Sequence, residues 1–247
     1  MARIVSHPGL RTGRNPTPEA IADIKLPAIL QGVGGWGFDE DFIVSHSSWT
    51  TADNTGSAMS GEALTIQNGK GGYGRIDSGT STDRYDSVYS QIVGGAFAPT
   101  LGAKIYFGTL LKVATLDGVN FAGLSTPAAV VFNAGTEALV SASHIGFEVN
   151  AGNVKFLSSG DIAIDTNINA VADQFIKLEF VVSDTNSVIP YVNGVQYPAA
   201  KLSSPPTLAM TPTISHQIGV VGAENVYLTM DWVKCYQSED IVRVGSA

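Results

Sequence analysis

Alternating apolar and polar residues mark the stretch from Phe175 to Tyr236 as β structure. In residues 174–182 apolar side chains recur at every second position, which is the pattern of a half-buried strand. The side chains expected on the core face are Ile176, Leu178, Phe180 and Val182, with Lys177 and Glu179 opposite. Asn193-Gly194 then separates two apolar runs and supplies the two positive-φ residues of a type I′ turn. The segment therefore predicts a strand followed by a hairpin.

From Phe38 onward, short apolar runs alternate with clusters of Gly, Asn, Asp and Ser, and no amphipathic helix separates them. Such a series predicts an all-β fold, an antiparallel β-sandwich. Within this part of the chain a short helix is considered only at Ile168–Phe175. The expected strands are Phe38–Val44, Ala63–Gln67, Tyr85–Val93, Ala103–Val113, Ala128–Phe132, Ser143–Asn150, Asn153–Leu157, Phe175–Ser183, the 188–197 hairpin, Thr213–Gly222 and Val226–Tyr236.

Three regions are expected: an extended N-terminal arm (1–35), a sandwich domain (36–238) and a C-terminal tail (239–247). Prolines and glycines in the arm oppose a continuous helix, although residues 18–24 could form a short one. The arm is also rich in apolar residues, which favours docking over a disordered tail. The residues expected to form an interface are Arg3, Arg11, Arg14, Ile21, Ile24 and Leu26.

Charge and composition narrow the class of protein. The formal net charge is −8, which argues against a nucleic-acid partner because phosphate binding needs clustered Lys and Arg. Residues 1–35 hold four Lys or Arg against two Asp or Glu, so a basic arm precedes an acidic body. Cys235 is the single cysteine, which excludes an intramolecular disulfide. No signal peptide and no apolar run of membrane-spanning length is present, so a soluble protein that is not exported by the usual route is expected.

Motifs for catalysis are weak. Two G-x-G-x-x-G matches, 32–37 and 69–74, run into strand-like segments instead of a helix, so neither predicts a dinucleotide site. The histidines, at 7, 46, 144 and 216, have no G-x-S-x-G elbow or metal-binding spacing near them. A β-sandwich glycosidase would carry carboxylates at alternate positions of a mid-chain strand. Only Asp39 and Asp41 have this spacing, at the entrance of the first expected strand, so no catalytic residue is predicted.

Ligand-binding residues are limited to calcium and aromatic candidates. Asp161 and Asp165, with Asn167 and Asn169 nearby, supply hard oxygen ligands within one segment, so calcium is the one cofactor considered. Asp and Asn are also turn formers, and no full EF-hand loop is present. Of the tryptophans at 36, 49 and 232, Trp232 alternates with Leu228 and Met230 and is expected in the core.

Several segments in order resemble the concanavalin A-like lectin/glucanase and laminin G-like jelly roll. They include Phe38-Asp-Glu-Asp-Phe42, Ile176-Lys-Leu-Glu-Phe180, Tyr191-Val-Asn-Gly194 and the closing Met230-Asp-Trp-Val-Lys234. The resemblance implies a jelly-roll sandwich. The chain lacks the Glu-x-Asp-x-Glu strand of the hydrolases of that family, and it lacks an obvious counterpart of the metal and sugar loop of the lectins.

An unexported sandwich with a Gly/Pro-rich arm is also similar to tailed-bacteriophage virion proteins of the decoration, cement or fibre type. This resemblance implies a non-enzymatic structural protein of a virion assembled in the bacterial cytoplasm. Its partners would be further copies of the chain and other virion proteins such as the major capsid protein. A lectin-like module that binds glycans is the alternative, and a divergent glycan hydrolase or lyase is a third.

Overall fold

The structure is a computed structural model that describes residues 3–7, 35–40, 42, 49–53, 63–67, 72–77, 85, 87–92, 97–99, 104–127, 131–133, 136, 139, 144–158, 161–184, 187–201, 206, 208–219 and 227–238. Every named element in these ranges is a β-strand. None of them contains a helix of the length and apolar character needed to cross a membrane.

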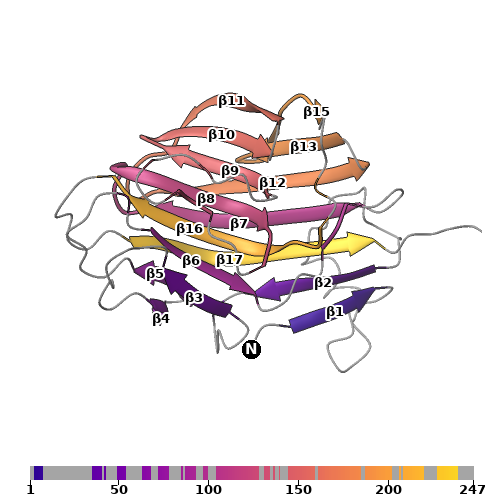
Figure 1. The fold of residues 1–247 in the computed structure, drawn as a ribbon, viewed down its shortest axis with the longest axis horizontal. Helices are drawn as coiled ribbons and strands as arrows, with labels where there is room; N and C mark the ends of the chain where they lie inside the picture. The colour runs from indigo at the N-terminus through magenta and orange to yellow at the C-terminus, as the bar shows by residue number, and fades with distance from the viewer. Residues whose placement is uncertain are drawn as a thin grey trace, which may run out of the picture.

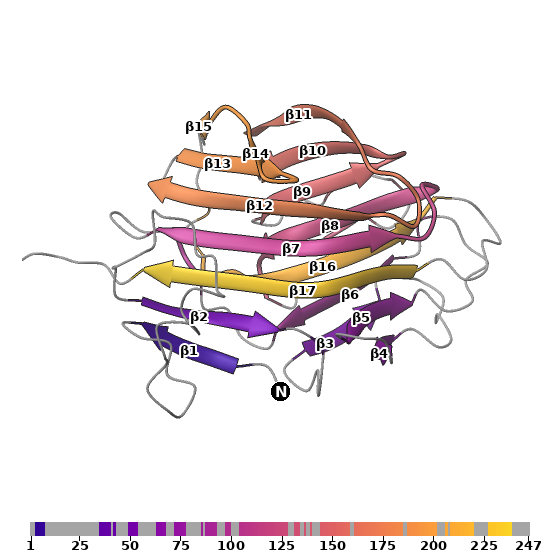
Figure 2. The ribbon, with the colours of Figure 1, turned by 180° about the vertical axis from the view of Figure 1, so that it is seen from behind.

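The strands form two antiparallel sheets that stack face to face, seen from opposite sides in Figures 1 and 2. The ten-stranded sheet has the order β1 (Arg3–His7), β2 (Gly35–Glu40), β17 (Tyr227–Ser238), β7 (Ile105–Val113), β12 (Phe175–Asp184), β13 (Ser187–Val192) and β14 (Val195–Gln196). Off this path, β15 (Ala200–Lys201) pairs with β13, β5 (Tyr73–Asp77) with β17, and β4 (Ala63–Gln67) with β5.

The seven-stranded sheet has the order β11 (Asp161–Asn169), β10 (Asn153–Ser158), β9 (His144–Asn150), β8 (Gly118–Ser125), β16 (Thr211–Ile218), β6 (Ser87–Ile92) and β3 (Trp49–Asp53). All described pairings in both sheets are antiparallel, which confirms the predicted antiparallel sandwich.

The core lies between the sheets and centres on four phenylalanines, two from each sheet. Phe180 stacks on Phe107 at 5.2 Å between ring centroids and meets Phe156 edge-on at 5.6 Å. Phe147 completes the group, 5.2 Å from Phe156. Edge-to-face and offset contacts of this kind stabilise aromatic clusters beyond the area they bury. The predicted inward face of β12 is therefore confirmed, because Phe180 reaches this centre.

The hairpin after β12 also has the predicted turn. Asn193 and Gly194 have φ of 50° and 78°, the two left-handed conformations of a type I′ turn. The Asn193 side chain accepts a hydrogen bond from the backbone N–H of Lys177 at 3.0 Å, which ties the turn to β12. The helix considered at Ile168–Phe175 is wrong: β11 runs to Asn169 and β12 begins at Phe175, with a turn between them.

Trp232 does not lie in the core as predicted. The pairing of β17 with β7 shifts register between Met230 and Trp232, and the extra residue of such a bulge reverses which side chains face inward. Leu228 and Met230 face the core before the bulge, and Val233 and Cys235 face it afterwards. Trp232 is consequently half-buried on the outer face of the ten-stranded sheet.

Candidate functional site

The outer face of the seven-stranded sheet carries buried, neutral polar side chains. Gln91 of β6 donates its amide N–H groups to Ser125 Oγ at 2.8 Å and Thr213 Oγ1 at 3.1 Å. Gln217 donates to the backbone carbonyls of Tyr85 at 3.0 Å and of Asn133 at 3.1 Å. These amide donors are therefore occupied within the chain.

A short apolar segment covers this face. Val131 and Phe132 pack on Val119 and Phe121 of β8, and Leu139 adds to the cluster. All but Leu139 are buried, so a ligand could not reach the centre of β8 without displacing the segment. The middle of this face is therefore covered by the chain itself and is not an open binding surface.

The structure describes two histidine side chains, and one of them, His144, is the cross-strand partner of Ser125. His216 points between the sheets, where its Nδ1–H donates to Asn120 Oδ1 at 2.7 Å. Full burial lowers the pKa of His216 to about 4, with a weak opposing effect from the Asp77 charge. The ring is therefore neutral at pH 7. His144 lies on the covered face, edge-on to Phe121 at 5.9 Å. His46 lies outside the described residues.

Carboxylates are sparse in the described strands, where Asp161 and Asp165 of β11 lie four positions apart. None of these strands has an Asp or Glu followed two positions later by another, and no two of them are cross-strand partners in the described pairings. Asp39 stands opposite Arg3 on one side and Lys234 on the other, and Asp41 lies outside the described residues. The Glu-x-Asp-x-Glu pattern of the β-sandwich glycosidases does not occur in these strands.

The calcium candidates lie on β11, at the edge of the seven-stranded sheet. Asp165 accepts hydrogen bonds from the backbone N–H of Asn167 at 2.8 Å and from Asn153 Nδ2 at 3.2 Å. These bonds, the one from Asn167 foremost, hold the pKa of Asp165 below its ordinary value. Among the described residues no three His, Cys, Asp or Glu side chains converge on a metal position. Asp161 opens the same strand, and calcium binding stays a prediction.

The predicted interface residues are mostly outside the described ranges. Arg3 is the first residue of β1, where its Cα partner is Asp39 of β2. The other five, Arg11, Arg14, Ile21, Ile24 and Leu26, fall on residues that the structure does not describe.

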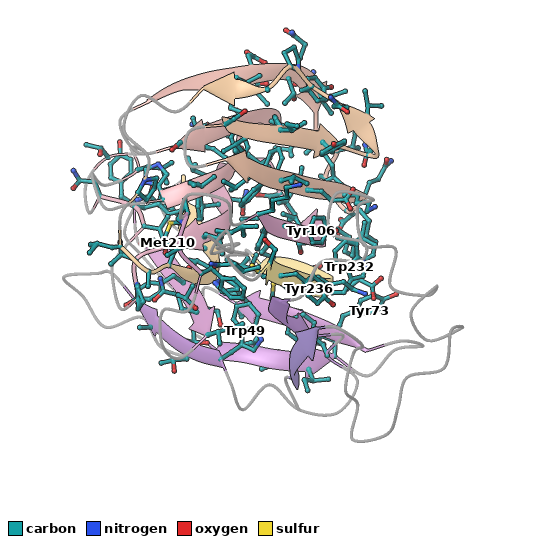
Figure 3. All side chains as sticks on the ribbon, turned by 90° about the vertical axis from the view of Figure 1, so that its right-hand side faces the viewer. Trp49, Tyr73, Tyr106, Met210, Trp232 and Tyr236 are labelled. Atoms are coloured by element: carbon teal, nitrogen blue, oxygen red, sulfur yellow. The ribbon has the colours of Figure 1, made fainter. Side chains whose placement is uncertain are left out.

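The outer face of the ten-stranded sheet carries a group of aromatic rings that we call the aromatic face. Its members come from five strands and are Tyr73, Tyr106, Phe175, Tyr191, Trp232 and Tyr236. Figure 3 places Tyr73, Tyr106, Trp232 and Tyr236 on the right, the side of the ten-stranded sheet, and Met210 on the left.

One end of the aromatic face is open to solvent. Phe175 is 39% exposed and stacks on Tyr73 with 5.6 Å between ring centroids. Lys112 lies over the Phe175 ring at 5.6 Å and within 3.8 Å of Asp173. The stacked pair and the cation beside it form a partly exposed aromatic surface at this end of the sheet.

Trp232 lies at the centre of the aromatic face between two lysines. Lys177 and Lys234 place their ammonium groups 5.9 Å and 5.6 Å from its ring. Gly108 lies beneath, because a Cβ there would come within 3.2 Å of the indole and 2.8 Å of the Tyr106 ring. The missing side chain of Gly108 lets both rings lie flat against the sheet.

The other end of the face is buried. Tyr106 stacks on Tyr236 with 6.2 Å between centroids and donates its hydroxyl to Glu179 at 2.7 Å. Glu179 also pairs with Lys177 at 2.8 Å. Burial, followed by the Glu179 charge, raises the pKa of Tyr106 far above its ordinary value, so this phenol stays a neutral donor. The Tyr106–Glu179–Lys177 chain fixes the polar groups beside Trp232.

No protein-family model and no curated protein matches the sequence, but solved structures do. The Bacillus licheniformis β-glucanase has a TM-score of 0.52 and 15% identity over 81% of this chain and 97% of that one. The carbohydrate recognition domain of Emp47p has a TM-score of 0.53 and 12% identity over 81% and 94%. A protein of unknown function, SO2946 of Shewanella oneidensis MR-1, has a TM-score of 0.55 and 12% identity over 97% and 100%.

The chain has a concanavalin A-like jelly-roll fold. This confirms the fold that the sequence resemblance predicted. Identities of 12–15% show the fold alone, since one fold supports many unrelated functions. The chemistry of this concanavalin A-like chain depends on its own side chains.

Sequence reasoning missed the aromatic face of this concanavalin A-like sandwich. Its rings are spread from Tyr73 to Tyr236, and only strand order and register bring them together. One signal was present, because Phe175, Lys177 and Glu179 share the polar side of a predicted strand, where a phenylalanine is out of place.

Proposed function

We propose that the chain is a carbohydrate-binding protein without catalytic activity, and that its aromatic face binds the glycan. The observation that carries the proposal is the partly exposed set of rings from Tyr73 and Phe175 to Trp232, bordered by lysines. The C–H faces of a pyranose ring are apolar and pack flat on aromatic side chains, which combine a large contact area with little loss of side-chain entropy on binding.

The polar groups beside Trp232 suit sugar hydroxyls. Lys177 donates hydrogen bonds and Glu179 accepts them, and the salt bridge between them at 2.8 Å holds both in place. Glu179 is itself fixed by the Tyr106 hydroxyl. A small number of well-oriented polar groups beside apolar contact area is the usual composition of a small-ligand site.

The described strands lack the Glu-x-Asp-x-Glu pattern of the β-sandwich glycosidases, which favours binding without hydrolysis. The printed descriptions of two similar structures, a β-glucanase and a carbohydrate recognition domain, both concern carbohydrates. Because these structures have low sequence identity to the chain, their descriptions support the class of ligand by analogy only and do not support an activity. That the chain is not an enzyme stays a prediction.

A glycan array tests the proposal, with the full chain applied in the presence of calcium and, separately, of EDTA. We expect binding to one group of related glycans. Trp232→Ala should lower the affinity for them by about tenfold or more, because the central ring is removed. Leu208→Ala is the matched control, since Leu208 is 58% exposed and lies just before β16 of the other sheet. No binding in either buffer, or equal loss in both variants, would contradict the proposal.

Hydrolysis is tested on the same glycans. Incubation with the chain and measurement of newly formed reducing ends should show no release above a boiled sample. Steady release of sugar fragments would instead favour a divergent hydrolase and end the non-catalytic assignment.

A structural role in a phage particle is the second candidate. One observation favours it: residues 3–7 of the predicted arm form β1 at the edge of the ten-stranded sheet, so the arm supplies a strand that can join protein to protein. The test is immunogold electron microscopy of the parent particle. Labelling at regular positions on head or tail is the expected result, and unlabelled particles would count against it.

A further inference from the structure

The accessible part of the aromatic face follows one strand, β7. Outward positions of β7 alternate with core residues such as Leu111, and each outward residue has a partner on β12 that faces the same side. In order along the strand, these outward pairs are Gly108 with Glu179, Leu110 with Lys177, and Lys112 with Phe175. The side chains of the face therefore form a row that runs parallel to β7.

Aromatic rings lie at two separate points of this row. The Trp232 indole lies over Gly108, where an added Cβ would come within 3.2 Å of it. Phe175, which stacks on Tyr73, is the partner of Lys112. Gly108 and Lys112 are four residues apart on one strand, which is about 13 Å at the usual rise of a strand. The two ring surfaces and the outward side of β7 between them form one strip.

The middle of the strip has an apolar floor and a polar border. Leu110 is half-buried on the outer side of β7, and its Cα partners are Trp232 on one side and Lys177 on the other. The Lys177 ammonium group lies 5.9 Å from the Trp232 ring and 2.8 Å from the Glu179 carboxylate. An apolar floor with hydrogen-bonding groups along one side suits a ligand that has flat apolar faces and hydroxyl groups at its edges.

The strip also has a defined length. Beyond Trp232 the next rings, Tyr106 and Tyr236, are only 4% and 5% exposed, so they offer almost no contact surface. At the other end, β7 stops at Val113 and β12 begins at Phe175. A pyranose unit with its linking oxygen spans about 5 Å, given bonds of about 1.5 Å. A chain of about three or four such units therefore reaches from one ring surface to the other.

We propose that the ligand is a linear glycan chain that lies lengthwise along β7 and contacts both ring surfaces at once. One sugar stacks on Trp232, another stacks on the Phe175–Tyr73 pair, and the sugars between them lie over Leu110 beside Lys177. The inference rests on the proposed glycan-binding function and adds the class of glycan, an extended chain instead of a terminal monosaccharide. Two linked contacts bind more tightly than either alone, because the second forms within the complex that the first has made.

Calorimetric titration of the full chain with oligosaccharides of increasing length tests the inference. The probes are linear gluco-, manno-, xylo- and chito-oligosaccharides of one to six units. In at least one series the affinity should rise by about tenfold or more from two to four units, and by less than about twofold from five to six, because the strip is then filled.

The outcomes separate this inference from the proposed function. Equal affinity for one and six units would overturn the inference and leave glycan binding in place. Binding on the array only to terminal or branched sugars, with none to the four linear series, would do the same. No binding to any glycan on the array would overturn both.

Two variants locate the gain in affinity on the two ring surfaces. In Phe175→Ala and in Trp232→Ala, four units should bind no more tightly than two, which is a loss of about tenfold for the longer chain. Phe175 is 39% exposed, so its replacement leaves the core packing in place. Leu208→Ala, on the other sheet, is the matched control and should keep the full gain. If either ring variant kept the gain, the chain would not contact both surfaces and the inference would be overturned.

Discussion

Acidification should destabilise the protein through His216. The imidazole lies between the sheets and donates one hydrogen bond, to Asn120 at 2.7 Å, while Nε2 is buried with no partner among the described residues. Burial lowers its pKa to about 4, whereas the unfolded chain has a value of about 6.5. Between these values the unfolded state binds more protons than the folded one, so folding stability rises with pH across this window.

The size of the effect follows from the two pKa values. Each unit of difference corresponds to about 1.4 kcal/mol, so roughly 3 kcal/mol of unfolding free energy is present above pH 6.5 and is lost on acidification to about pH 4. His216→Asn places an amide donor near the position of Nδ1, which keeps the hydrogen bond to Asn120, and does not titrate. Its unfolding free energy should therefore fall by clearly less than that of the parent over the same range.

Urea unfolding followed by circular dichroism at pH 7, 6, 5 and 4 measures this difference. Carboxylates contribute equally to parent and variant, so the comparison isolates His216. If the two proteins lost the same free energy between pH 7 and pH 4, or if the parent became more stable on acidification, the burial argument would be refuted.

Three further predictions follow from the packing. Gly146→Ala should lower the unfolding free energy by about 1–3 kcal/mol in a urea titration, because the new Cβ would lie 2.8 Å from the Cα of Gly123 on the neighbouring strand; an unchanged midpoint would contradict it. Burial raises the pKa of Cys235 well above its ordinary value, so Ellman's reagent should react only after denaturation, and rapid reaction of the native protein would be the opposite result. Gly194→Val should lower the unfolding free energy by about 1–2 kcal/mol, because Gly194 has a φ of 78°. Val195→Ala, in the adjacent strand, should lower it by less.

The parts of the fold that were predicted correctly depend on local pattern. Residues 63–67 form β4 with the predicted bounds, and Asn193-Gly194 forms the predicted turn. Both signals lie within a few consecutive residues, where side-chain alternation and turn chemistry act directly. The order of strands in the two sheets cannot be read in this way, because it depends on pairings between residues far apart in the sequence, such as β2 with β17.

The errors in the predicted strands have physical causes. β8, Gly118–Ser125, was not predicted because both of its faces are buried, with Phe121 under the covering segment and Leu124 in the core, so its sequence does not alternate. The segment predicted as a strand at Ala128–Phe132 includes part of that cover, and its described residues show only an isolated bridge from Phe132 to Leu139.

The candidate site was missed for a different reason. Trp232 reached the outer face through a bulge whose position depends on the pairing with β7, and no local signal marks that position. The calcium candidate Asp165 was chosen for its residue type. Its carboxylate accepts hydrogen bonds from Asn167 and Asn153, which is the local role that Asp has in turns.

The central claim concerns where a glycan binds, and backbone NMR of the isotopically labelled chain tests it most directly. Titration with a glycan selected from the array should shift amide signals of Lys112, Lys177 and Trp232 on the aromatic face, with saturation at one common dissociation constant. Signals of Gln91 and Thr213, under the covered face of the other sheet, should stay in place. Shifts confined to those two residues and their neighbours, or no shifts at saturating glycan, would contradict the account.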